Sequence, residues 1–270
     1  MSPPEVIKRV LSAAIMVPLV VWIIRLDSPR YFFALVAAVA AMAVVELYAM
    51  AEGCGIHPHR WWGAAGTVLV TSTFLPDGPN LGLVLSLCAA AVPLISLLGR
   101  QAPSEALSSM ATTLFGVLLV GLLLGHAVAL RCVEGHGVQL VFFLLWVIWS
   151  ADTVAYGVGT LLGRRAITPR ISPNKTVEGT VAGLAVALGA AFVGRLWFLP
   201  ELPWWHAIIL GGILGTLAFL GDLCESLLKR GAQVKDSAGW LPGHGGFLDR
   251  TDSFLLSAPL LYHYWNWLRP

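Results

Sequence analysis

The chain has 270 residues, of which 57% are hydrophobic and only 12% are charged, and its formal net charge is +2. A soluble domain has roughly 45–50% apolar and about 25% charged residues, so this chain lacks the charge to cover a water-facing surface. The composition excludes a soluble enzyme, a secreted disulfide scaffold, a coiled coil and a disordered chain, and it favours an all-α, polytopic membrane protein. The small net charge also gives no bulk affinity for nucleic acid.

Nine apolar stretches are predicted to be transmembrane helices, because one crossing of the hydrocarbon core needs roughly 20 apolar residues. They cover about residues 10–25, 31–51, 61–76, 81–98, 106–131, 138–163, 176–195, 204–224 and 252–268. Turn-forming residues separate some of them, such as Asp77-Gly78-Pro79-Asn80 between the third and the fourth. The sequence therefore predicts one integral membrane domain over residues 1–270.

The distribution of Lys and Arg predicts how this domain is oriented in the membrane. Nine crossings would place the two termini on opposite sides. Of the 17 basic residues, 12 fall on the side of the N-terminus, and most of these lie in the connections 164–175 and 228–251. The N-terminus and both basic connections are therefore expected in the cytoplasm.

Four acidic residues lie within or at the edge of apolar stretches, where a charge costs at least about 2.5–3.5 kcal/mol on the insertion scale. They are Glu46, Asp152, Asp222 and Glu225. For Glu46 the favoured interpretation is a helix-packing hydrogen bond or an ion pair. Asp152 either lines a polar cavity or has a structural role.

A polar stripe is predicted at the end of the eighth helix. Its members have helical spacing, so they share one face of an otherwise apolar segment. The stripe consists of Asp222, Glu225, Ser226, Lys229 and Arg230. Basic side chains at a helix end reach the membrane surface by snorkelling, but the acids one or two turns deeper have no such explanation. This face is expected to line a water-filled cavity or to meet a partner.

The segment 231–252 combines glycines, bases and acids in a way that suits a phosphate site. It contains five glycines, whose backbone N–H groups can form anion-binding nests. Its bases are Lys235 and Arg250, and its acids are Asp236, Asp249 and Asp252. Carboxylates repel phosphate unless a divalent cation lies between them, and Mg²⁺ typically binds one or two protein carboxylates together with substrate phosphates. The segment therefore predicts a Mg²⁺-dependent nucleotide or polyphosphate site, with a salt-bridged cytoplasmic loop as the alternative.

The connection 164–179 is a second candidate for phosphate binding. Ser172 or Asn174 is expected to cap the seventh helix, with Thr176 and Glu178 in its first turn. Capping does not explain Lys175, because a cation at a helix N-terminus is unfavourable unless an anion joins it. The start of this helix is therefore predicted to face phosphate from the same side of the membrane.

The order of residues in segment 226–252 resembles the signature of the phosphatidate cytidylyltransferase family, whose members are also called CDP-diacylglycerol synthases. The matching positions are Ser226, Lys229, Arg230, Lys235, Asp236, Pro242, His244, Gly245, Gly246, Asp249, Arg250 and Asp252. Ser150-Ala151-Asp152 and the segment 172–179 are also similar to this family, so the likeness covers roughly residues 140–255. Residues 136–270 would then be the catalytic half of the domain, and residues 1–135 an N-terminal helical half.

The resemblance implies an enzyme that condenses CTP with phosphatidic acid to CDP-diacylglycerol and pyrophosphate at the cytoplasmic face of the membrane. The lack of a transit peptide leads us to expect a bacterial plasma (inner) membrane. The resemblance also implies a homodimer, and Mg²⁺ with K⁺ beside it. The implied metal ligands are Asp222, Asp249 and Asp252. The other implied catalytic residues are Lys229, Arg230, Lys235, Asp236, His244 and Arg250, with His244 either donating to a phosphate or fixing the loop. The implied substrate-binding residues are Asp152, Ser172, Asn174, Lys175, Thr176, Ser226, Gly245 and Gly246.

Two other functions compete with this one. A CTP-dependent polyprenol kinase would transfer the γ-phosphate of CTP and release CDP instead of pyrophosphate. A secondary transporter for an anionic solute would place functional polar groups near the midplane and would show an internal repeat. The polar groups here gather at one predicted face, and no repeat is visible, so the sequence favours the cytidylyltransferase.

Overall fold

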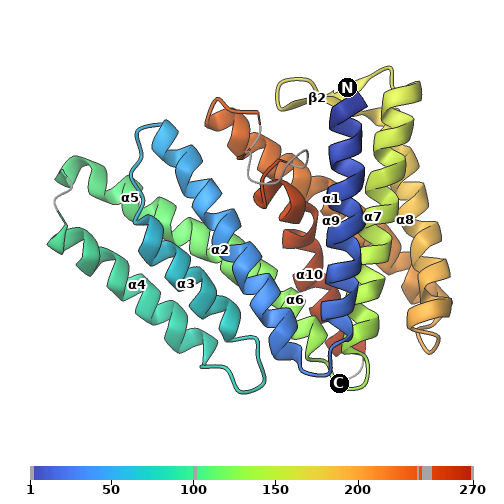
Figure 1. The fold of residues 1–270 in the computed structure, drawn as a ribbon, viewed down its shortest axis with the longest axis horizontal. Coiled ribbons are helices and arrows are strands. Elements are labelled where there is room, and N and C mark those ends of the chain that lie inside the picture. The colour runs from blue at the N-terminus through green and yellow to red at the C-terminus, as the bar shows by residue number, and fades with distance from the viewer. Residues whose placement is uncertain (1–2, 100–101, 236, 239–244, 269–270) are drawn as a thin grey trace. The chain divides into compact units, whose positions relative to one another are not determined.

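The computed structural model describes residues 3–99, 102–235, 237–238 and 245–268, with side chains from residue 14 onward. Nearly all of its elements are α-helices, as Figure 1 shows. The chain divides into two compact units, each made of two segments. The first unit comprises Met1–Cys132 and Gly231–Thr251, and the second comprises Val133–Arg230 and Asp252–Pro270.

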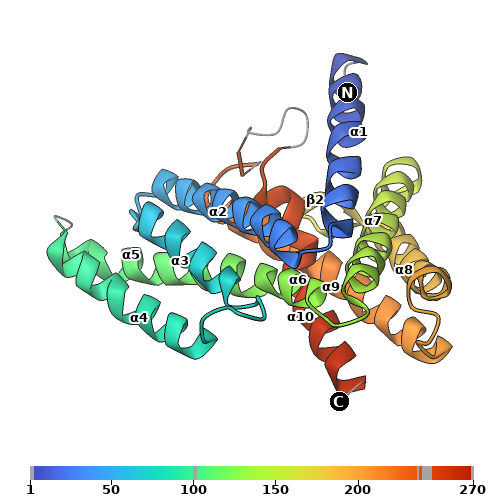
Figure 2. The same ribbon diagram turned by 60° about the horizontal axis from the view of Figure 1, so that its bottom comes forward.

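The first unit is a group of packed helices. Its elements are α1 (Pro3–Arg25), α2 (Pro29–Gly53), α3 (Arg60–Ser72), α4 (Leu81–Leu98), α5 (Pro103–Gly116), the π-helical segment η1 (Val117–Leu122) and α6 (Leu123–Arg131). In both Figure 1 and Figure 2, α3 lies beside α2 and α4 lies beside α5. The predicted break before α4 is confirmed, since residues 77–80 lie between α3 and α4. The side chain of Asn80 accepts a hydrogen bond from the Leu83 N–H at 3.0 Å and caps α4.

Buried hydrogen bonds join distant elements of the first unit. Tyr48 of α2 is fully buried, and its hydroxyl donates to the Thr113 carbonyl oxygen of α5 at 2.7 Å. At the end of α6, the Arg131 guanidinium donates to the carbonyl oxygens of Ile24 and Leu26 at 2.9 and 2.6 Å. These contacts satisfy polar groups that the apolar surroundings would otherwise leave unpaired.

The second unit contains long helices and a two-stranded hairpin. It is formed by α7 (Gly137–Leu162), β1 (Ala166–Thr168), β2 (Ser172–Thr176), α8 (Val177–Phe198), α9 (Trp204–Gly231) and most of α10 (Leu248–Leu268). The strands are antiparallel and form a two-stranded sheet between α7 and α8. The indole N–H of Trp146 in α7 donates to the Ala190 carbonyl oxygen in α8 at 2.9 Å.

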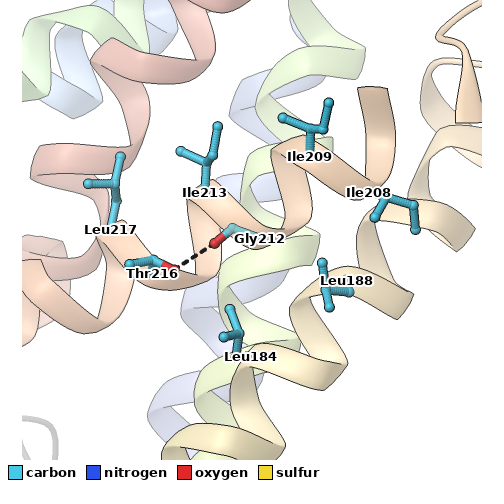
Figure 3. A pocket seen from close by; sticks show the side chains of 8 residues that line it. All are labelled: Leu184, Leu188, Ile208, Ile209, Gly212, Ile213, Thr216 and Leu217. Carbon is cyan, nitrogen blue, oxygen red and sulfur yellow. Dashed lines mark hydrogen bonds between the residues drawn. The ribbon is translucent and has the colours of Figure 1, made fainter. Parts of the chain in front are cut away.

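An open apolar groove of about 460 Å³ runs between α8 and α9. Figure 3 shows leucine and isoleucine side chains from both helices around it. The hydroxyl of Thr216 in this groove donates to the Gly212 carbonyl oxygen one turn earlier at 2.7 Å. The groove therefore presents hydrocarbon to its surroundings, as expected for helices in a bilayer.

Each of the nine predicted stretches overlaps a helix, and six helical segments in the described part are long and apolar enough to cross a membrane. These six are Pro29–Gly53, Leu81–Leu98, Pro103–Arg131, Gly137–Leu162, Val177–Phe198 and Trp204–Gly231. The protein is therefore an integral membrane protein. Helix α3 has 13 residues, which span about 20 Å at 1.5 Å per residue, less than the hydrocarbon core. The nine-crossing topology and the cytoplasmic N-terminus stay predictions.

Candidate functional site

Three acidic side chains converge in the second unit. Asp222, Glu225 and Asp252 each offer a carboxylate oxygen, and these oxygens lie within 4.8 Å of one another. Glu225 and Asp252 are buried, with 2% and 8% of their surface exposed. Asp222 and Glu225 share a face of α9 because they are three residues apart. Gly221 lets α10 approach that face, since a Cβ atom at this position would overlap the Asp252 carbonyl oxygen.

Two lysines accompany these carboxylates. The Nζ atom of Lys175 in β2 lies 2.7 Å from Asp222 Oδ2, and the Nζ atom of Lys229 lies 2.6 Å from Glu225 Oε2. Both lysine side chains are largely buried, and Lys175 also lies over the Phe219 ring at 5.2 Å. Two cations facing three carboxylates leave an excess of one negative charge if all three acids are ionised. A cation would relieve that repulsion, and an all-oxygen donor set fits the hard ion Mg²⁺.

Neighbouring elements add polar groups to this cluster. The Ser253 hydroxyl donates to Asp152 Oδ2 of α7 at 3.4 Å, which brings Asp152 beside the residue that follows Asp252. The Nε atom of Arg230 donates to the Ile171 carbonyl oxygen at 3.0 Å and ties the end of α9 to the hairpin. Ser226 is buried in α9, one turn after Asp222. Two members of the predicted polar stripe, Asp222 and Arg230, therefore contact the hairpin, while the expectation that the stripe lines a water-filled cavity stays a prediction.

The prediction that Ser172 or Asn174 caps the helix after the hairpin is wrong. Both residues lie in strand β2, where residues 172–176 pair with β1, and the cap of α8 is Thr176, whose Oγ1 accepts a hydrogen bond from the Gly179 N–H at 3.2 Å. The anion that joins Lys175 near this helix start is the Asp222 carboxylate. The predicted place of Glu178 in the first turn is confirmed.

The glycine-rich segment contributes a separate arrangement in the first unit. Asp249, in the first turn of α10, accepts hydrogen bonds at Oδ2 from the Gly246 and Ser237 N–H groups at 2.8 and 3.4 Å. Gly245 has a φ of 78°, in the left-handed region that favours glycine. Lys235 and Arg250 are exposed to solvent. The predicted residues Asp236 and His244 lie outside the described residues.

The structure thus joins two of the three predicted metal ligands, Asp222 and Asp252, in one cluster. The third, Asp249, belongs to the first unit. Glu225 completes the cluster, although it was expected only as an intramembrane acid of the polar stripe and not as a metal ligand. Its spacing of three residues from Asp222 was the signal that pointed to a shared face.

The apolar helices and the buried carboxylate–lysine cluster define a membrane protein whose polar site suits phosphate chemistry at a metal ion. The Cytidylyltransferase family matches residues 7–268 of the chain. The chain therefore belongs to this family, which confirms the resemblance seen in its signature and makes the protein a nucleotidyltransferase.

Individual relatives agree with this assignment. A phosphatidate cytidylyltransferase of Synechocystis is 33% identical over 95% of both chains. A phosphatidate cytidylyltransferase of Bacillus subtilis is 43% identical over 54% of both chains. The matched region therefore spans about half of the length of that relative. The uncharacterized protein YnbB of Escherichia coli K12 is 33% identical over 82% of this chain and 76% of its own.

Proposed function

We propose that this protein is a phosphatidate cytidylyltransferase, which converts CTP and phosphatidic acid to CDP-diacylglycerol and pyrophosphate. The observation that carries the proposal is the cluster of three carboxylates with Lys175 and Lys229 in a chain of this family. Mixed charges of this kind suit a metal-bound polyphosphate. The membrane-spanning helices suit a second substrate that carries two acyl chains.

The chemistry of this reaction requires positioning and charge neutralisation more than proton transfer. A phosphate oxygen of phosphatidic acid forms a bond to the α-phosphorus of CTP, and the bond from that phosphorus to the bridging oxygen of the β-phosphate breaks. The attacking phosphate is already ionised near neutral pH, so it needs no strong base. Lys175 and Lys229, which the carboxylates hold in place, are proposed to neutralise phosphate oxygens during this exchange.

Further roles follow from the sequence resemblance and are proposed on that ground. Mg²⁺ would be held by Asp222 and Asp252, with Asp249 as a further predicted ligand, and when bound it would stabilise the charge of the leaving pyrophosphate. The residues proposed to bind CTP or phosphatidic acid are Arg230, Lys235, Arg250, Ser226, Ser172, Asn174, Thr176 and Asp152. A K⁺ ion and a homodimer stay predictions.

Product analysis tests the proposed activity. Purified protein in mixed micelles of detergent and phosphatidic acid should release one pyrophosphate for each CDP-diacylglycerol that mass spectrometry detects. Both products should disappear when either substrate is left out or EDTA is added. Release of CDP together with a phosphorylated lipid would contradict the proposal.

Removing Lys229 is expected to lower both stability and turnover. Lys229→Ala removes the ion-pair partner of Glu225, which is 2% exposed. Breaking a buried ion pair lowers the free energy of unfolding by about 3–5 kcal/mol. The double variant Lys229→Ala/Glu225→Gln should regain most of the thermal stability but not the turnover with CTP. Full activity in the double variant would contradict the role of Lys229 at the phosphates.

The orientation of the site is tested by labelling. We expect the site to face the cytoplasm at the inner membrane of a bacterium. Lys235→Cys, in a variant whose native cysteines are replaced by serine, should react with a membrane-impermeant maleimide only after the inner membrane is permeabilised. Asp77→Cys, on the opposite predicted side, should react in spheroplasts with an intact inner membrane. The reverse pattern would contradict the orientation.

A further inference from the structure

Glu46 is a buried carboxylate that no step of the proposed chemistry uses. It lies about two turns before the end of α2 in the first unit and is 1% exposed. Its Oε1 atom accepts a hydrogen bond from the Phe247 N–H at 2.9 Å, and its Oε2 atom accepts from the Leu248 N–H and the Ser237 hydroxyl, each at 2.9 Å. Of the two interpretations that the sequence allowed, the hydrogen bond is confirmed, and its donors lie about 200 residues away in the chain.

The groups that donate to Glu46 lie next to the groups that donate to Asp249. All of them belong to Ser237 and residues 246–248, which are called the turn below. Ser237 gives its hydroxyl to Glu46 and its N–H to Asp249, while the Gly246 N–H also goes to Asp249. Leu248 is the first residue of α10, so Glu46 satisfies an N–H group that the helix itself leaves unpaired. The turn is thus held between two carboxylates, one from α2 and one from α10.

Gly246 shows how closely these groups fit together. A Cβ atom at this position would overlap both the Ser237 hydroxyl oxygen and the Glu46 carboxylate. The glycine therefore has a packing role in addition to any contact with phosphate. The close fit limits movement of this backbone toward α2 and so restrains the residues that donate to Asp249.

From this geometry we propose that Glu46 is a positioning residue for the cytidylyl transfer. It fixes residues 246–248 and Ser237, and through them the direction of the Asp249 carboxylate. Without Glu46, buried donors of this turn lose their acceptor and the turn shifts toward other partners. The inference rests on the proposed function, because Asp249 matters to the reaction only if it serves that chemistry.

Hydrogen exchange tests the proposal without any need for activity. In EDTA, Glu46→Ala should speed exchange in a peptide covering residues 245–250 and leave peptides from α7 and α8 unchanged. Tyr48→Phe is the matched control, because it removes a buried hydrogen bond from the same helix without touching this turn. The control should leave exchange at residues 245–250 as in the wild type.

Measurements of turnover then show whether Glu46 positions Asp249 for the reaction or only stabilises the fold. Groups that orient a metal ligand typically contribute about 10–100-fold, so Glu46→Ala should lower kcat and raise the half-saturating Mg²⁺ concentration by such a factor. Glu46→Gln keeps one acceptor oxygen, but in either orientation its NH2 group faces a backbone N–H donor, that of Phe247 or that of Leu248. This variant should therefore regain only part of the lost kcat, and Tyr48→Phe should keep wild-type kcat.

The outcomes distinguish this inference from the proposed function. Faster exchange at residues 245–250 with unchanged kcat and Mg²⁺ dependence would overturn the positioning role and leave the proposed function standing. Unchanged exchange in Glu46→Ala would overturn it as well. A wild-type protein that transfers no cytidylyl group would overturn the proposed function and, with it, this inference.

Discussion

Asp222→Asn is expected to lower turnover by about 10³-fold while the protein stays folded, because stabilisation of charge by a metal is worth several kcal/mol. The asparagine keeps the size of the side chain but loses the charge that pairs with Lys175 and that a divalent cation requires. The Asp222 side chain is 40% exposed, but its partner Lys175 is only 17% exposed and loses its ion pair, so a moderate loss of thermal stability without unfolding is expected. Turnover at saturating Mg²⁺ and thermal unfolding in detergent measure the two effects separately.

Asp77→Asn is the control for this prediction. Asp77 is also an aspartate paired with a cation, Arg30, at 2.5 Å, but it lies in the connection before α4 and is 60% exposed. The control should keep wild-type turnover. Near-normal turnover in Asp222→Asn would remove this residue from the metal site.

Asp249→Asn should produce the second large loss, by about 10²–10³-fold in kcat, as expected for removal of a group that stabilises developing charge. The amide oxygen of asparagine can still accept the hydrogen bond from the Gly246 N–H, so the turn before α10 should persist. What disappears is the negative charge. Rapid-quench measurement of a single turnover checks the chemical step directly.

The comparison of Asp249→Asn with Asp249→Ala separates charge from geometry. The alanine variant also loses the hydrogen bonds to the Gly246 and Ser237 N–H groups, so it should show faster hydrogen exchange in the turn. Both variants should be equally inactive. An asparagine variant that turns over like the wild type at high Mg²⁺ would show that the charge of Asp249 is not needed.

The helices could be predicted from the sequence because each apolar stretch carries its own signal. The hairpin of β1 and β2 could not be predicted from the sequence. Its strands have only three and five residues, and they show no hydrophobic pattern that would indicate their pairing. That pairing placed Ser172 and Asn174 in a strand and moved the helix cap to Thr176. The apolar run of the third stretch, predicted over 61–76, overestimated the end of the helix, since its apolar residues continue beyond the end of α3 at Ser72.

Within the site, the sequence predicted only which residues share a face of one helix. The spacing of Asp222, Glu225 and Lys229 indicates a shared face of α9. The pairing of Lys175 with Asp222 and the three donors around Glu46 join segments far apart in the chain. Neither arrangement follows from local spacing, because tertiary packing alone brings these partners together.

CTP labelled separately at the α- and γ-phosphates, supplied with phosphatidic acid and either Mg²⁺ or EDTA, distinguishes the possible reactions most directly. The α-label should enter the lipid and the γ-label should leave as pyrophosphate, and both should require Mg²⁺. Transfer of the γ-label to a lipid would instead show a CTP-dependent kinase. If folded protein with both substrates and Mg²⁺ moves neither label, the assignment as a phosphatidate cytidylyltransferase is wrong.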